Sequence, residues 1–175
     1  MVLITHSSST QLGLEYLKYK PKKLKKIVLI SASVKDSDPV YLKLILLLPR
    51  IILYSLYRTF LLNHEEKVYQ QILFSKKTKK LKIKRFVEEN NIPRLETFLI
   101  YKTYWNFNSL SWVKDFKKPA LIITGEDDVL VPKSKDEELA KAMPKSELYV
   151  IKEAGHMCFY EKPNLVNKRM ERFLK

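Results

Sequence analysis

The amino-acid sequence predicts an α/β fold, in which a small and mostly parallel sheet is covered by helices and interrupted by a helical insertion. Short, nearly continuous apolar runs alternate with helical patterns at both ends of the chain, which is typical of parallel strands buried on both faces. Between these regions, residues 34–112 are rich in Leu, Ile, Tyr and Lys and have a helical pattern. We therefore expect one core formed by residues 1–33 and 113–175, with residues 34–112 as a helical cap.

The first elements form a βαβ unit. Residues 2–5 are a short apolar run that ends in a cluster of polar residues, and leucines spaced from Leu12 to Leu17 predict a helix that ends near Pro21. Residues 26–31 are a second apolar run. The order of strand, tight turn, helix and strand favours a parallel pair.

The same alternation returns after the insertion. Residues 120–124 and 147–151 predict a third and a fourth strand, while residues 135–143 and 164–174 predict amphipathic helices. The core should therefore contain four strands, and loops that follow these strands should meet at one edge of the sheet.

Within the insertion, residues 41–62 are long and apolar enough to suggest a membrane span. Lys43, Arg50 and Arg58 interrupt this stretch, however, and each charge near a bilayer centre costs about 2.5–3.5 kcal/mol on insertion scales. Pro49 adds a break. We expect a pair of cap helices that are buried or face the substrate, with peripheral contact to a membrane surface as the alternative.

Composition excludes several other classes of protein. The net charge of +14 comes mostly from short runs of Lys, which indicate a solvated surface, so no nucleic-acid partner is expected. The single cysteine, Cys158, excludes an internal disulfide framework, and with three scattered His it argues against a zinc site. The N-terminus lacks the pattern of a signal peptide, which makes the cytoplasm the default location.

A candidate nucleophile, Ser7, follows the first predicted strand. A serine on a sharp strand-to-helix turn has its Oγ pushed out at the top of the sheet, with the backbone N–H of Ser8 beside it to hold an oxyanion. The usual pattern is G-x-S-x-G, and here Thr5 and Ser9 replace the two glycines. A serine-rich turn is also typical of a helix N-cap, so this motif alone leaves both interpretations open.

Two further polar loops support the catalytic interpretation. Asp128 lies in an acidic turn after the third strand, and His156 follows the fourth, where Gly155 would free the loop to reach the serine. The carboxyl ends of parallel strands are where α/β folds place their sites. The chain order Ser, Asp, His is the order expected for a nucleophile elbow with its acid and base.

These stretches resemble the α/β-hydrolase superfamily, in the branch of lid-bearing serine esterases, lipases and iminopeptidase-like enzymes. Residues 119–132 resemble the block P-x-L-I-I-x-G-x-x-D-x-x-V-P, which aligns the acid with Asp128 rather than Asp127. Gly155-His156 followed by Glu161-Lys162-Pro163 resembles the block of the catalytic histidine. In some members the acid follows the strand after the elbow, which makes Asp36 an alternative.

The resemblance implies a reaction that needs no cofactor. His156 would remove the proton of Ser7 as Ser7 attacks an acyl carbonyl, while Asp128 stabilises the imidazolium. The substrate would be a small apolar acyl compound or ester, because the cap is apolar at residues 46–62 and carries the aromatic residues Tyr101, Tyr104, Trp105 and Phe107.

The resemblance also implies strands before the elbow, together with a loop that supplies a second oxyanion donor, which this sequence lacks. Residues 2–5 would then form an exposed apolar edge, where the chain could self-associate or bind a separate chain that holds the missing half. Two functions follow from the sequence. The chain is a serine hydrolase of carboxylic esters, impaired if its partner half is absent, or a non-catalytic hydrolase-fold remnant that acts as a binding or assembly module.

Overall fold

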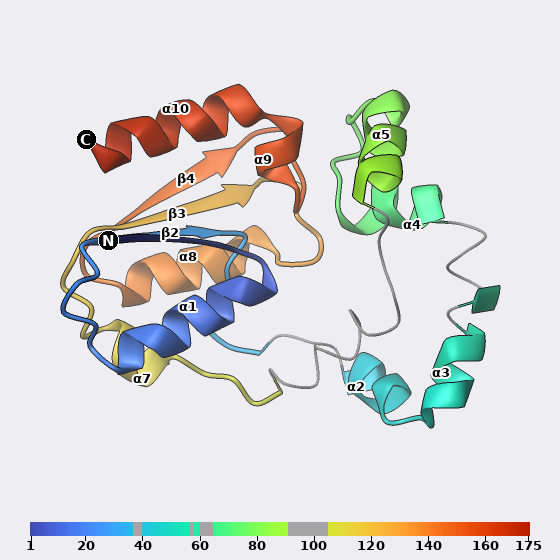
Figure 1. The fold of residues 1–175 in the computed structure, drawn as a ribbon, viewed down its shortest axis with the longest axis horizontal. Helices are drawn as coiled ribbons and strands as arrows, with labels where there is room; N and C mark the ends of the chain where they lie inside the picture. The colour runs from blue at the N-terminus through green and yellow to red at the C-terminus, as the bar shows by residue number, and fades with distance from the viewer. Residues whose placement is uncertain (37–39, 57, 60–64, 91–104) are drawn as a thin grey trace.

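The computed structural model of the chain describes residues 1–36, 40–56, 58–59, 65–90 and 105–175. At its centre is a four-stranded sheet in the order β1 (Val2–His6), β2 (Lys26–Ile30), β3 (Ala120–Gly125) and β4 (Ser146–Ile151) (Figure 1). All three pairings are parallel, from Val2 opposite Lys26 to Gly125 opposite Ile151. This arrangement confirms the predicted fold class. It also brings the loops that follow the strands to one edge of the sheet.

Helices cover both faces of the sheet, as Figure 1 shows. On one face lie α1 (Ser8–Lys18), the short α7 (Leu110–Val113) and α8 (Lys133–Ala142). On the other face lie α9 (Cys158–Glu161) and α10 (Pro163–Leu174). The alternation of side chains along β2 explains why its run is apolar throughout, since Ile27 and Leu29 enter the first core and Val28 and Ile30 the second.

Between β2 and β3 the chain forms the inserted segment, by which we mean residues 34–112. Its described helices are α2 (Val40–Leu46), α3 (Arg50–Leu56), α4 (Glu65–Ile72) and α5 (Lys80–Asn90). Near α4 and α5, a small core of Tyr69, Phe74, Ile83 and Phe86 packs against Met157 and Tyr160, which follow β4. Residues 69–86 of the inserted segment are therefore packed against the carboxyl edge of the sheet.

Helices α2 and α3 expose most of their described apolar side chains. Pro49 separates α2 from α3, as predicted, and Leu46 and Leu53 are buried. Leu44 in α2 and Ile51 in α3 are exposed by 61% and 75%, however, and most other described apolar side chains of these two helices are also exposed. Helices long and apolar enough to cross a bilayer are absent from the described ranges. Pro93, Tyr101 and Tyr104 lie outside the described residues.

Strand β1 is one edge of the described sheet, because its one partner strand there is β2. Val2 and Ile4 are exposed by 41% and 51%, whereas Val28, the partner of Ile4 in β2, is fully buried. An edge strand presents a row of unpaired backbone N–H and C=O groups to any further strand that approaches it.

Candidate active site

Ser7 occupies the turn between β1 and α1 in a backbone conformation that residues other than glycine rarely adopt. Its φ of 55° and ψ of −129° store on the order of 1–3 kcal/mol of strain, which the surrounding structure must hold. The Ser7 N–H donates to the Ile30 carbonyl at 3.0 Å. The Ser7 carbonyl accepts from the backbone N–H and the hydroxyl of Thr10, at 2.8 and 2.6 Å. Ser7 is thus held from both the sheet and the helix.

The two positions where glycines are usual have local substitutes. The Ser9 hydroxyl accepts from the His6 N–H at 2.9 Å and donates to the His6 carbonyl at 2.7 Å, which closes the turn. Thr5 is accommodated by a glycine in α1, because a Cβ at Gly13 would lie 3.0 Å from Thr5 Cγ2. The absence of a side chain at Gly13 therefore leaves the space that Thr5 occupies. The sequence motif around Ser7 does not reveal this compensation.

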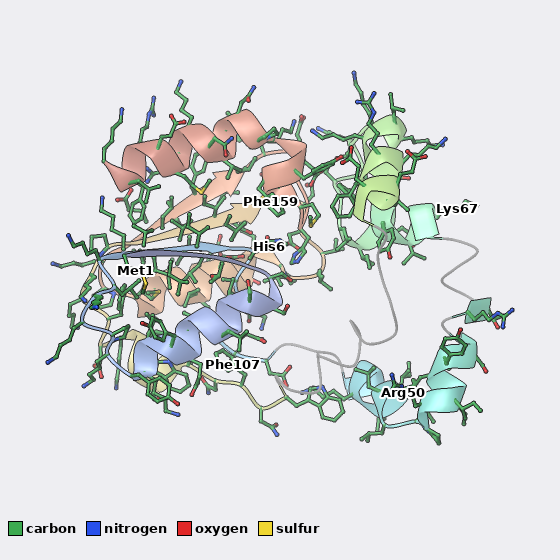
Figure 2. All side chains as sticks on the ribbon, in the orientation of Figure 1. Met1, His6, Arg50, Lys67, Phe107 and Phe159 are labelled. Carbon is green, nitrogen blue, oxygen red and sulfur yellow. The ribbon has the colours of Figure 1, made fainter. Side chains whose placement is uncertain are left out.

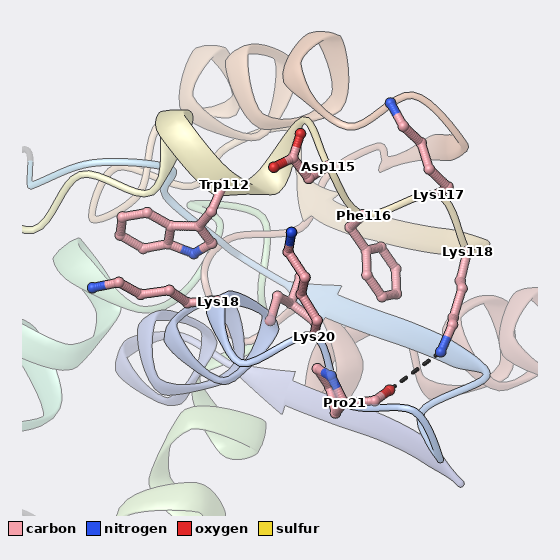
Figure 3. Close-up of a pocket in the computed structure, with 9 residues that line it drawn as sticks. Lys18, Lys20, Pro21, Trp112, Asp115, Phe116, Lys117 and Lys118 are labelled. Carbon is pink, nitrogen blue, oxygen red and sulfur yellow. Dashed lines mark hydrogen bonds between the residues drawn. The ribbon is translucent and has the colours of Figure 1, made fainter.

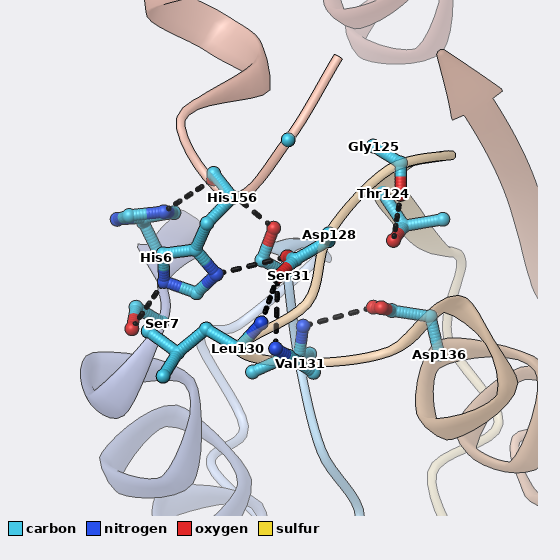
Figure 4. A network of polar contacts seen from close by, with 12 residues as sticks. His6, Ser7, Ser31, Thr124, Gly125, Asp128, Leu130, Val131, Asp136 and His156 are labelled. Carbon is cyan, nitrogen blue, oxygen red and sulfur yellow. Dashed lines mark hydrogen bonds and ion pairs between the residues drawn. The ribbon is translucent and has the colours of Figure 1, made fainter. Parts of the chain in front are cut away.

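The structure brings the three predicted residues together (Figure 4). His156 Nε2 lies 2.7 Å from Ser7 Oγ, and His156 Nδ1 lies 2.8 Å from Asp128 Oδ2. The other carboxylate oxygen of Asp128 accepts from the backbone N–H groups of Leu130 and Val131, at 3.0 and 2.8 Å. Because a carboxylate only accepts, Nδ1 carries the proton, and Nε2 is left to accept from the Ser7 hydroxyl.

Neither of the other candidate acids contacts this histidine in a described interaction. Asp36 accepts from the Lys43 ammonium and from the Asn106 N–H. Asp127 accepts from the Ser75 hydroxyl. The geometry thus selects Asp128 from the three carboxylates that the sequence offered.

Ser8, the expected oxyanion donor, is the first residue of α1. The first N–H groups of a helix have no partner within the helix and lie at the positive end of its dipole. The Ser8 N–H, with no partner within the helix, can therefore donate a hydrogen bond to a negative oxygen that forms beside Ser7 Oγ.

The glycines near the site act through close packing. A Cβ at Gly155 would lie 2.7 Å from backbone atoms of Phe74 and Ser75, and one at Gly125 would lie 2.2 Å from the Gly155 carbonyl oxygen. None of the glycines has a positive φ. Gly155 therefore does not free the loop of His156, as the sequence suggested, but lets the inserted segment pack directly against it.

His6 is a site residue that sequence analysis did not identify. Its Nε2 lies 3.1 Å from the His156 carbonyl, and its ring lies against that of His156, with centroids 4.9 Å apart (Figure 4). The ring of Phe159 also lies beside it, with a centroid 4.8 Å away; Figure 2 labels His6 and Phe159 near the same edge of the sheet. Burial, reinforced by the nearby His156, lowers the pKa of His6 from 6.5 to about 4. A neutral His6 adds no positive charge beside His156. In the sequence, the one signal that could have identified His6 as a site residue is its position next to Ser7.

The end of β2 and the start of α8 add two more buried groups beneath the site. The Ser31 hydroxyl donates to the His156 carbonyl at 3.2 Å, so that carbonyl is held by both Ser31 and His6. Asp136 is fully buried and accepts from the Ala32 N–H at 2.8 Å. Burial raises the pKa of Asp136 well above its usual value, which favours its neutral form.

Two clefts in the described part of the chain are lined by residues other than Ser7, Asp128 and His156. One, of about 210 Å³, is bordered by Lys18, Lys20, Trp112 and Lys118, near the amino ends of the strands (Figure 3). The other cleft, of about 610 Å³, lies between α5 and the residues Phe159, Tyr160 and Pro163. Phe159 both lines this cleft and contacts the ring of His6. In the described part of the chain, no three His, Cys, Asp or Glu side chains are grouped to hold a metal ion.

A parallel sheet with a serine on its strand-to-helix elbow, and with His and Asp at the same edge, is the arrangement of an α/β hydrolase. The family model described as alpha/beta hydrolase fold matches residues 1–163, and the chain belongs to this family.

Among curated relatives, an uncharacterized hydrolase of Bacillus subtilis strain 168, YugF, is 28% identical over 183 residues, covering 99% of this chain and 65% of that protein. A solved esterase from Thermogutta terrifontis matches 99% of this chain and 64% of its own, with a TM-score of 0.79 at 17% identity. The putative non-heme bromoperoxidase BpoC of Mycobacterium tuberculosis H37Rv matches 99% of this chain and 66% of its own, with a TM-score of 0.76 at 19% identity. The chain thus spans about two-thirds of the length of these relatives.

The lowered pKa of His6 predicts how stability depends on pH. Between pH 6.5 and about 4 the unfolded chain binds a proton at His6 that the folded chain does not, so acid favours unfolding. The free energy of unfolding should therefore fall by on the order of 3 kcal/mol more in the unaltered chain than in His6→Gln over this interval. Urea unfolding at several pH values measures both, and parallel profiles would contradict the assignment.

Proposed function

We propose that this chain carries the catalytic residues of a serine hydrolase that acts on carboxylic esters or related acyl substrates. The observation that carries the proposal is the unbroken line of hydrogen bonds from Ser7 Oγ through His156 to Asp128, at 2.7 and 2.8 Å. Membership of the α/β hydrolase family supports it.

The reaction follows from the positions of these groups. His156 Nε2 accepts the hydroxyl proton as Ser7 Oγ attacks the acyl carbon, and the buried Asp128 carboxylate stabilises the imidazolium that forms. The Ser8 N–H donates to the carbonyl oxygen as it gains negative charge. His156 then returns the proton to the leaving alcohol. In the second step, water attacks the acyl carbon as His156 takes a proton from it, and His156 passes that proton to Ser7 Oγ as the bond between Ser7 and the acyl carbon breaks and the acid leaves.

Helices α2 and α3 favour an apolar substrate. Most of their described apolar side chains are exposed, including Leu44, Ile51 and Ile52. On a chain of net charge +14, the same surface also supports peripheral contact with an anionic membrane, as a further proposal.

A second candidate is a binding or assembly module without turnover. The observation that favours it is the exposed apolar edge of β1, where Val2 and Ile4 are exposed by 41% and 51%. We propose that β1 pairs with a further strand, from a second copy of this chain or from a separate chain.

Labelling with a fluorophosphonate, which reacts with activated serines, tests the hydrolase. We expect covalent labelling that is abolished in Ser7→Ala and reduced by about 10⁴ in Asp128→Asn, because that variant would hold the wrong tautomer of His156. Ser134→Ala, at an exposed position of α8, is the matched control and should be labelled as the unaltered chain is. A folded sample that is not labelled, or one still labelled in Ser7→Ala, refutes the catalytic role.

Sedimentation velocity tests pairing through β1. If two copies associate along this edge, Ile4→Lys should convert the larger species into monomer, since it places a charge on the exposed apolar edge. Leu81→Lys is the matched control, because Leu81 on α5 is exposed by 62% and lies outside the sheet. Identical sedimentation of both variants at concentrations where the unaltered chain associates would exclude β1 as the self-association surface.

A further inference from the structure

Glu161 is a buried carboxylate that faces two parts of the chain at once. It ends α9 and is 7% exposed. Its Oε1 accepts from the Gly155 N–H at 2.6 Å, while its Oε2 accepts from the Ser75 N–H at 3.0 Å and from the Thr78 hydroxyl. One oxygen therefore holds the loop that carries His156, and the other holds the inserted segment.

Direct backbone contacts join the same two parts. The Met157 N–H donates to the Leu73 carbonyl at 3.0 Å. A Cβ at Gly155 would overlap backbone atoms of Phe74 and Ser75. The N–H groups on both sides of His156 are thus occupied, the one at Gly155 by Glu161 and the one at Met157 by residue 73 of the inserted segment.

Two side-chain contacts close the arrangement. The Ser75 hydroxyl donates to Asp127, which lies next to Asp128 in the chain. The Lys82 ammonium donates to the Glu161 carbonyl at 3.0 Å. Residues 73–82 are consequently fastened to both of the loops that supply the acid and the base.

We infer that Glu161 is a positioning residue, which fixes His156 relative to Ser7 by fastening the loop after β4 to residues 73–78 of the inserted segment. The inference rests on the proposed function, because it concerns the geometry of the proposed base. Glu161 contacts no reacting atom. It acts through the Gly155 backbone, and a misplacement of about 1 Å in such a site can lower the rate by about 10²-fold.

The physical reason for coupling is the cost of a buried charge without partners. If residues 73–78 moved away, the Glu161 carboxylate would lose the Ser75 and Thr78 donors, and a carboxylate that lacks donors within a protein is costly. The carboxylate would then reorient toward water, which would release the Gly155 N–H. Productive geometry at His156 and docking of residues 73–78 therefore occur together.

Glu161→Gln and Glu153→Gln make a matched pair for the test. Both carboxylates link the loop after β4 to the inserted segment, but Glu161 does so from a buried position, whereas Glu153 does so through an exposed ion pair with Lys77 and also pairs with Lys162. Exposed pairs contribute little, so Glu153→Gln removes a carboxylate without removing the buried link. In Glu161→Gln, an NH₂ group replaces one of the two carboxylate oxygens. It then faces an N–H group from which Glu161 accepted a hydrogen bond, and two donors cannot bond each other. We expect fluorophosphonate labelling and kcat for a chromogenic acyl ester to fall at least about tenfold with KM little changed, and Glu153→Gln to stay within about twofold.

Hydrogen exchange separates the positioning role from catalysis as such. The Gly155 and Ser75 amides should exchange faster in Glu161→Gln than in the unaltered chain. In Glu153→Gln their exchange rates should equal those of the unaltered chain. Thr78→Val, which removes one donor from the inserted segment, should act in the same direction with a smaller effect, and it decides the matter if Glu161→Gln does not fold.

The inference is overturned if folded Glu161→Gln matches Glu153→Gln in labelling rate, or if Thr78→Val leaves both labelling and Gly155 exchange unchanged. A chain that is never labelled refutes the proposed function instead. In that case, faster exchange of the Gly155 amide in Thr78→Val would still support the link between the loop after β4 and residues 73–78. Unchanged exchange would refute this link.

Discussion

The hydrogen bond between His156 Nε2 and Ser7 Oγ is the contact on which the rest of the site depends. It joins residues 149 positions apart in the chain, at 2.7 Å. The parallel sheet makes this possible because β1, β3 and β4 all end at the same edge, and each is followed by one of the three residues. The apolar strands are thus needed chiefly to bring three polar loops to one place.

Holding that contact requires that almost every polar group around His156 be occupied. Its ring bonds Ser7 and Asp128, its carbonyl accepts from His6 and Ser31, and the neighbouring N–H groups are held by Glu161 and the inserted segment. The strained backbone of Ser7 is likewise held from two elements. Such preorganisation is what allows a weak nucleophile to react.

The sequence predicted the four strands, the parallel order and the Ser7–His156–Asp128 contact, because apolar runs and the polar loops after them are local patterns. It could not predict what depends on distant packing. Gly13 compensates for Thr5 from another element, and Glu161 binds Ser75, 86 residues away. The pKa of His6 depends on burial, which no local pattern gives. The sequence also left open whether the helices of residues 41–62 are buried or face substrate or a membrane, because apolar helices are consistent with each of these.

The central claim is that this chain alone assembles the hydrogen-bonded line from Asp128 to Ser7. Proton NMR of the folded chain in water tests it most directly, through the strongly deshielded proton that a histidine Nδ1 shows when bonded to a buried carboxylate. We expect one such resonance, present in Ser7→Ala and absent from both His156→Ala and Asp128→Ala. A folded chain that lacks the resonance, or retains it in Asp128→Ala, would contradict the claim.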